Sequence, residues 1–176
     1  MTAADTSARS AAVEVAVAYL DALGGSDPNA VADLVAVDFV NEHQNALGSG
    51  CEGREEYRRR LPGFFAGFPG RRYEIVKLTA GTTGDDGVTD VVARYRFRTD
   101  VVVGHGDDRR TEHIDLPGVM WIEVRAGEVI RRVDTWDALS YFHQSGDTPT
   151  GFTRTSGQLP NHRPDHSLTS HRSDQP

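Results

Sequence analysis

Hydrophobic side chains recur with a helical period in the first part of the chain and with a period of two further on. Over 11–23 they recur every three or four residues, and the glycines at 24–25 can adopt the left-handed conformation that ends a helix. A second helix is expected from Pro28, because the N–H at a first helical position has no partner within the helix, so proline, which lacks an N–H, loses nothing there. A third helix is expected over 55–68, kinked or divided by Pro62.

From Tyr73 onward, apolar and polar residues alternate as they do in strands with one buried face. The expected strands begin at Tyr73, before a turn at 81–87, and continue with 88–103, 111–124 and a last strand after the turn at Ala126-Gly127. Pro117-Gly118 interrupts the third of these strands and predicts a β-bulge. A short strand is also expected at 38–43. Helices followed by an antiparallel meander predict an α+β fold.

Alternation along the two longest strands predicts the two faces of the sheet. On strand 88–103, apolar and small side chains share the face that should pack on the helices, and arginines alternate on the other face. These arginines are Arg94, Arg96 and Arg98. We expect them to pair with Asp115 and Glu123 on the next strand. Val119 and Trp121 lie on the same polar face, which predicts a homodimer surface there.

Composition predicts a single folded domain over 11–146, between polar segments at 1–10 and 147–176 that we expect to be disordered. The formal net charge of −7, with no basic patch, argues against nucleic acid as a partner. Neither a signal-peptide pattern nor an apolar run of about 18 residues is found, so we expect a cytoplasmic protein that is not bound to a membrane. Cys51 has no second cysteine to pair with and is expected to be an inert thiol.

The stretch 127–147 places Asp134 where a strand pattern gives way to a helical one, and such strand ends commonly border pockets. Asp137 can cap the helix that follows, which leaves Asp134 as the candidate catalytic acid or base. Further candidates for the wall of a substrate pocket are Tyr19, Asn41, His43, Met120 and Trp136. We expect no metal site, because the histidines show no ligand-type spacing.

Asp134 also lies in a recognisable pattern, Gly-x-Val-x-x-x-x-Asp-x-x-Asp from Gly127 to Asp137, followed by Leu-x-x-x-x-Gln-x-Gly. The pattern resembles the C-terminal signature of the SnoaL-like polyketide cyclases, which have the nuclear-transport-factor-2-like cone fold. Phe39-Val40-Asn41-x-His43 and Pro117-Gly118-Val119 extend the resemblance. It implies that Asp134 is the catalytic acid/base. The family's catalytic histidine aligns with Met120, so that part of its apparatus is not expected here.

A second, shorter pattern points to a different chemistry. Arg98-x-Asp100 together with Asp134 is similar to the catalytic triad of the limonene epoxide hydrolases, which share the cone fold. This resemblance implies that one aspartate activates water, the other protonates the epoxide and arginine orients both. Strand alternation places Arg98 and Asp100 on the outer face, so a bulge near Thr99 would be needed to turn them inward.

These observations predict an α+β cone in which a curved antiparallel sheet packs against three N-terminal helices. The leading hypothesis is a cofactor-free acid/base isomerase or cyclase that acts on a small hydrophobic, carbonyl-containing secondary metabolite. Asp134, beside Met120 and Trp136, would be poorly solvated there and therefore more basic than in water. The alternatives are an epoxide hydrolase that uses Arg98, Asp100 and Asp134, and a non-catalytic small-molecule binding module.

Overall fold

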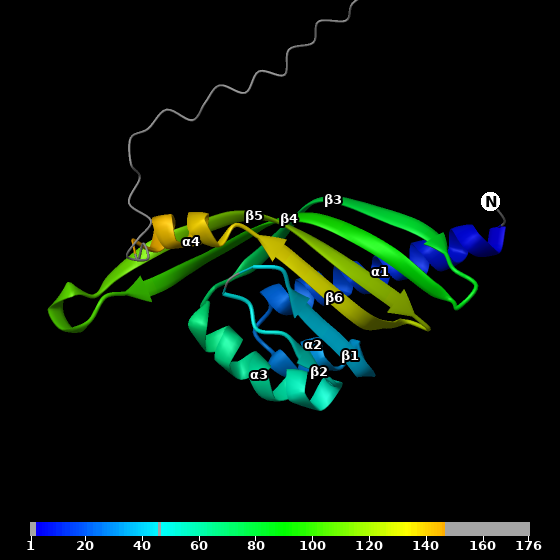
Figure 1. The fold of residues 1–176 in the computed structure, drawn as a ribbon, viewed down its shortest axis with the longest axis horizontal. Helices are drawn as coiled ribbons and strands as arrows, with labels where there is room; N and C mark the ends of the chain where they lie inside the picture. Colours follow the sequence, from blue (N-terminus) through cyan, green and yellow to red (C-terminus); the bar gives the residue numbers. More distant parts are fainter. Residues whose placement is uncertain (1–2, 46, 147–176) are drawn as a thin grey trace, which may run out of the picture.

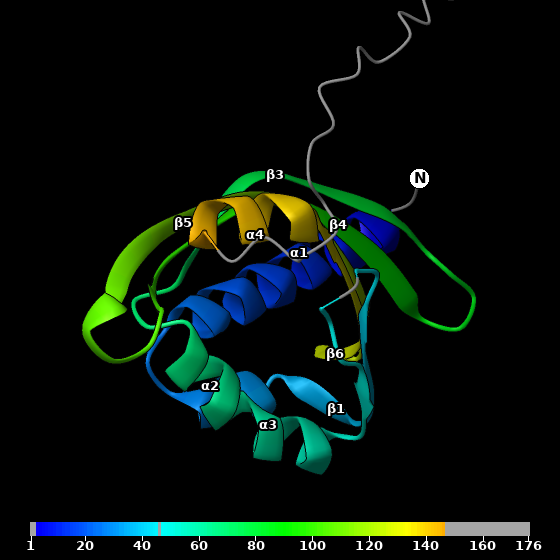
Figure 2. The ribbon, with the colours of Figure 1, turned by 60° about the vertical axis from the view of Figure 1, so that its left-hand side comes forward.

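The computed structural model describes residues 3–45 and 47–146 and consists of one curved sheet with helices on its concave side (Figures 1 and 2). The helices are α1 (Ala3–Gly24), α2 (Pro28–Ala32), α3 (Arg54–Gly67) and α4 (Ala138–Ser145), with a short 3-10 turn, η1 (Gly106–Asp108). The strands are β1 (Val35–His43), β2 (Cys51–Glu52), β3 (Arg72–Thr83), β4 (Val88–Val103), β5 (Arg110–Arg125) and β6 (Glu128–Trp136). This arrangement confirms the predicted α+β cone. The expected tail at 147–176 lies outside the described residues.

The six strands follow the order β2-β1-β6-β5-β4-β3, and one neighbouring pair, β1 and β6, is parallel. The sheet is therefore mixed, which corrects the expectation of a purely antiparallel one. The chain from β2 to β5 separates β1 from β6, so no hairpin forces these two strands to be antiparallel. Helix α1 crosses the concave side beneath β3 and β4, and α4 lies past the end of β6 against β5 (Figures 1 and 2).

The N-terminal segment is helical from Ala3, so the prediction of a disordered lead-in up to residue 10 is wrong. Two contacts hold this first part of α1 on β3: Arg9 Nη2 donates to the Ala80 carbonyl at 2.9 Å, and the Asp5 carboxylate accepts from the Thr83 N–H at 3.4 Å. Tertiary contacts of this kind stabilise a helix whose own sequence is only weakly amphipathic. No helix in the described ranges is long and apolar enough to cross a membrane.

The strand pairing shows no bulge at Pro117-Gly118, which corrects that prediction. The β4–β5 register is unbroken from Val88↔Arg125 to Val103↔Arg110. The β5–β6 ladder ends at Gly118↔Trp136, so Pro117 lies just past it, where no β6 residue requires an N–H donor. The register shift of the β5–β6 pairing lies instead between Glu123 and Val124. Pro62 likewise leaves α3 as one undivided helix.

Strand alternation predicted the two faces of the sheet correctly. Ala93, Tyr95, Phe97, Thr99 and Val101 are all buried on the inner face of β4. On the outer face, Arg96 and Arg98 both pair with Asp115, at 2.8 Å and 3.2 Å. Glu123 pairs with Arg131 of β6 rather than with an arginine of β4.

Two side chains fix α4 where β6 stops. Asp137 is the N-cap, as predicted, and accepts a hydrogen bond from the Leu139 N–H at 3.0 Å. The Gln144 amide accepts from the Asp115 N–H at 2.7 Å and donates to the Asp115 carbonyl at 3.0 Å. Gln144 thus extends the β5 ladder beyond the end of β6, and Gly146, with a φ of 71°, ends the helix in the left-handed conformation.

Candidate active site

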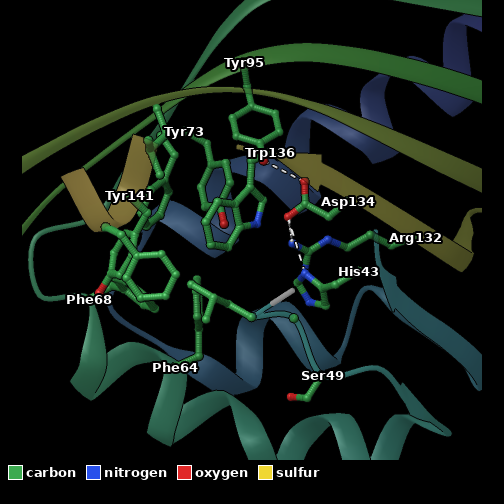
Figure 3. Close-up of a pocket in the computed structure, with 15 residues that line it drawn as sticks. His43, Ser49, Phe64, Phe68, Tyr73, Tyr95, Arg132, Asp134, Trp136 and Tyr141 are labelled. Carbon is green, nitrogen blue, oxygen red and sulfur yellow. Dashed lines mark hydrogen bonds and ion pairs between the residues drawn. The ribbon is translucent and has the colours of Figure 1, made fainter. Parts of the chain in front are cut away.

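A cavity of about 430 Å³ lies between the concave side of the sheet, α3, α4 and the segment that follows β1 (Figure 3). This volume falls in the range of small-molecule sites, ~300–1,000 Å³. Its walls are mostly aromatic: Phe64, Phe68, Tyr73, Tyr95, Phe97, Trp136, Tyr141 and Phe142 line it, with Leu47 and Leu116. The polar side chains at one end are His43, Ser49, Arg132 and Asp134.

Asp134 is the acid of this cavity and is only 2% exposed. Its Oδ1 accepts a hydrogen bond from the Tyr95 hydroxyl at 2.6 Å, and its Oδ2 accepts one from Arg132 Nη2 at 2.5 Å (Figure 3). The guanidinium offsets much of the cost of removing a carboxylate from water. Each carboxylate oxygen thus accepts one hydrogen bond, which holds the group in a fixed orientation.

Arg132 is buried as well, behind Asp134 and among phenol rings. The nearby hydroxyls of Tyr19 and Tyr57 lie 2.6 Å apart, and burial raises the pKa of both phenols, which keeps them neutral. Asp134 is therefore the anion that balances Arg132. As an ion pair, the two residues add no net charge to the cavity.

His43 reaches the same carboxylate from β1, because the parallel register places His43 opposite Asp134. Its Nδ1 lies 3.9 Å from Asp134 Oδ2, and its Nε2 lies 3.4 Å from the Asn41 amide nitrogen. Burial, and secondarily the charge of Arg132, lower the pKa of His43 to about 4. The imidazole is thus neutral near pH 7. A histidine–aspartate pair forms here through β1, although Met120 occupies the position of the family histidine on β5.

Tyr73 and Trp136 project into the cavity near the carboxylate (Figure 3). Among the described residues, no hydrogen bond engages the Tyr73 hydroxyl or the Trp136 indole N–H. Burial raises the pKa of Tyr73, so its hydroxyl is a neutral donor. Two polar donors in an aromatic cavity are therefore available to a ligand.

The predicted wall residues divide into two groups. His43 and Trp136 line the cavity. Asn41 lies behind His43, Tyr19 is buried beside Tyr57, and Met120 is buried opposite Asp134 in the strand register, so these three do not face the cavity.

Arg98 and Asp100 are not part of this site, which corrects the prediction of an epoxide-hydrolase triad. Arg98 pairs with Asp115 and Glu74, and Asp100 Oδ1 lies 2.9 Å from His113 Nδ1, all on the outer face of the sheet. Thr99, between them, points inward and donates to the Pro69 carbonyl at 2.8 Å. The regular β4 backbone thus keeps both residues away from Asp134.

Three polar residues of the site were missed from the sequence: Arg132, Tyr95 and Tyr73. A signal for Arg132 existed, because it precedes Asp134 by two positions on one strand and so shares its face. Alternation along 88–103 puts Tyr95 on the inner face but does not distinguish it from the core residues beside it. No pattern in the sequence brings Tyr73 to Asp134. Within the described ranges, no group of three or more His, Cys, Asp or Glu side chains could hold a metal ion.

Comparison with known proteins agrees with this architecture. The model of the SnoaL-like domain matches residues 16–132. A protein with a ketosteroid isomerase-like fold from Catenulispora acidiphila, solved with trimethylamine, is 22% identical with a TM-score of 0.60, over 80% of this chain and 97% of that one. A candidate SnoaL-like polyketide cyclase from Jannaschia sp. CCS1 is 18% identical with a TM-score of 0.64, over 80% and 95% of the two chains.

TerC, crystallised with polyporic acid, is 16% identical with a TM-score of 0.57, over 77% of this chain and 98% of that one. The search of curated proteins finds no match. Identities this low establish a shared fold, whereas the domain match covers more than half of the chain. The chain belongs to the SnoaL-like family.

Proposed function

We propose that this protein is a cofactor-free acid/base enzyme, an isomerase or cyclase, that acts on a small hydrophobic substrate with a carbonyl group. The observation that carries the proposal is the Asp134 carboxylate, held by two side chains at the wall of an aromatic cavity. A carboxylate held in a fixed orientation at the cavity wall can take a proton from a substrate carbon that the cavity positions against it. A binding module would not require an ionised acid oriented in this way.

The chemistry follows from the positions of the donors and the base. Asp134 takes a proton from the carbon next to the carbonyl. The electrons of that C–H bond form a C=C bond, and the π electrons of the C=O bond move onto the carbonyl oxygen. Tyr73 and Trp136 donate hydrogen bonds to the resulting enolate oxygen, which stabilises its charge. Return of the proton to a different atom gives an isomer. Alternatively, the enolate carbon attacks a second carbonyl and closes a ring, and the alkoxide formed from that carbonyl takes the proton from Asp134.

Neighbouring positions support Asp134 in this role. Arg132 pairs with the carboxylate, Tyr95 fixes its orientation and neutral His43 can exchange a proton with it after a small movement. Membership of the SnoaL-like family and the fold shared with the candidate cyclase of Jannaschia sp. CCS1 are consistent with an isomerase or cyclase.

The test is exchange of α-protons for deuterium in 2-tetralone, a neutral bicyclic ketone, followed by mass spectrometry in D₂O. The wild-type protein should accelerate exchange over buffer, and Arg98→Gln should do so equally well because Arg98 lies on the outer face. Limonene oxide, incubated in parallel, should not be hydrolysed. Calorimetric binding of 2-tetralone without any acceleration of exchange, or hydrolysis of the epoxide, would contradict the proposal.

A further inference from the structure

Tyr95 and Asp134 meet although a whole strand lies between them. Tyr95 is on β4 and Asp134 on β6, with β5 in the middle. In the strand register Tyr95 is opposite Gly118, and Gly118 is opposite Trp136. The Tyr95 ring therefore has to pass over β5 at Gly118 to reach the carboxylate.

A side chain at position 118 would occupy the path of this ring. A Cβ built on Gly118 would lie 2.3 Å from both Cζ and Oη of Tyr95, and 2.8 Å from its Cε2. The inward-facing neighbours of Gly118 along β5 are the large residues Leu116 and Met120. The gap in the row of side chains thus lies directly under the phenol ring.

The backbone does not explain the glycine. Gly118 lies within β5 and is not among the described glycines with a positive φ, so any residue could adopt its conformation. The regular pairing on both sides of Gly118 also shows no bulge that would require one. The space occupied by Tyr95 is the feature that excludes a side chain.

Tyr95 cannot move aside without losing its contact to the carboxylate. The residue is 3% exposed, its ring centroid lies 5.1 Å from that of Tyr73, and its hydroxyl donates to Asp134 Oδ1 at 2.6 Å. A hydrogen bond of this length tolerates only a small displacement of the donor. A methyl group at position 118 would therefore separate Tyr95 from Asp134, even if the strand itself kept its shape.

We propose that Gly118 is a positioning residue of the active site. Its missing side chain lets Tyr95 cross β5 and hold one oxygen of Asp134 while Arg132 holds the other, which fixes the plane of the carboxylate. The catalytic consequence rests on the proposed function, whereas the geometric claim does not. Gly118→Ala should thus reproduce the effect of removing the Tyr95 hydroxyl.

The first experiment needs no substrate. The proton of a short, buried phenol–carboxylate hydrogen bond gives a downfield NMR resonance, which Tyr95→Phe would assign by its disappearance. Gly118→Ala should abolish or shift this resonance. The matched control is Gly81→Ala on β3, where an added Cβ would make only ordinary contacts at 3.7 Å with Asp90. An unchanged resonance in Gly118→Ala would overturn the proposal.

A double-mutant cycle covers the case in which Gly118→Ala is too unstable for NMR. Tyr95→Leu removes the atoms that the new methyl group would meet, so Gly118→Ala should lower the unfolding midpoint in the wild-type background and have little effect in the Tyr95→Leu background. Equal losses in both backgrounds would show that the glycine serves the strand and not Tyr95, and would overturn the proposal.

The catalytic consequence is measured by deuterium exchange into 2-tetralone. Gly118→Ala and Tyr95→Phe should each lower kcat by about 10-fold or more, with KM nearly unchanged, because a hydrogen bond to a charged group is lost. The double variant should be no slower than either single variant. Additive losses would overturn the role of Gly118. A wild-type protein without exchange activity would contradict the proposed function and leave the NMR result to decide the geometry.

Discussion

Arg132 and Asp134 form an ion pair in which neither member reaches bulk water, with exposures of 4% and 2%. Such a pair is costly to bury and becomes far more costly when one partner is removed, because the remaining charge is left without compensation. The arrangement places the candidate base and its cationic partner together at the wall of an aromatic cavity. It also makes the folded state sensitive to single substitutions at this position.

Arg132→Met should lower the free energy of unfolding by about 3–5 kcal/mol, since Asp134 would remain buried without its cation. Urea denaturation at pH 7 measures this loss. Arg131→Met is the matched control: Arg131 is half-exposed and pairs with Glu42 and Glu123 near solvent, so its removal should cost less than about 1 kcal/mol. Similar losses in the two variants would argue against a buried charge pair.

His43 should make stability depend on pH. Its pKa falls from 6.5 to about 4 on folding, so the unfolded chain binds more protons between these values. The contribution of His43 to the free energy of unfolding should therefore be constant above about pH 6.5. It should decrease as the pH falls toward 4, by up to ~3 kcal/mol in total.

The matching measurement is a series of urea melts from pH 7.5 to pH 4 on the wild type, His43→Gln and His113→Gln. His43→Gln should flatten the dependence over this window, whereas His113→Gln should not, because His113 is exposed on the outer face. A wild-type curve that His43→Gln leaves unchanged would show that other groups cause the acid sensitivity.

Arg71 connects the C-terminal ends of two helices, α1 and α3. It is 4% exposed and donates at 2.8 Å to the carbonyls of Leu23 and Gly25, at the end of α1. The same guanidinium donates to Phe68 O at 3.3 Å, after α3, and lies 3.2 Å from the centroid of the Phe65 ring. A cation at two helix C-termini stabilises both through their dipoles and unpaired carbonyls.

Arg71→Met should lower the free energy of unfolding by about 2–4 kcal/mol, because several buried carbonyls would lose their donor. Arg72→Met at the neighbouring exposed position should change it by less than about 0.5 kcal/mol. Thermal or urea unfolding distinguishes the two. If both variants melt with the wild type, the helix ends do not depend on Arg71.

The elements were predictable where local pattern decides them. The bounds of β4 and the N-cap of α4 agree with the sequence, because a long alternating strand and an aspartate before an amphipathic helix are local signals. The parallel pairing of β1 with β6 and the helical start at Ala3 could not be predicted. Both depend on contacts between segments far apart in the chain.

The site residues that could be predicted are those whose own strand shows where they lie. Asp134 and Trp136 could be placed from β6 alone, and His43 from its own short strand. Their meeting point depends on the curvature of the sheet, which brings β1, β4 and β6 around one cavity (Figure 3). A period-of-two pattern reports which face a residue takes but not which strands converge, so Tyr73 and Tyr95 remained unassigned.

The outer face of the sheet is the surface on which we propose that a second copy of the chain docks. Trp121 is 47% and Val119 42% exposed there. Trp121→Glu should convert a dimer to monomers by placing a charge in an apolar interface. Sedimentation equilibrium at micromolar concentration measures this. Val37→Glu is the control, because Val37 is exposed on β1, which β6 separates from β5. A wild-type chain that is monomeric at this concentration would contradict the interface.

The most direct test of the account is deuterium exchange into 2-tetralone by Asp134→Asn. Asparagine keeps the shape of the side chain but removes the base and the partner of Arg132, so the variant should be less stable than the wild type. Under conditions where circular dichroism shows a folded protein, its rate should fall by ~10²–10⁴-fold. Asp100→Asn, on the outer face, should exchange at the wild-type rate. A folded Asp134→Asn protein that exchanges as fast as the wild type would contradict the assignment of Asp134 as the base.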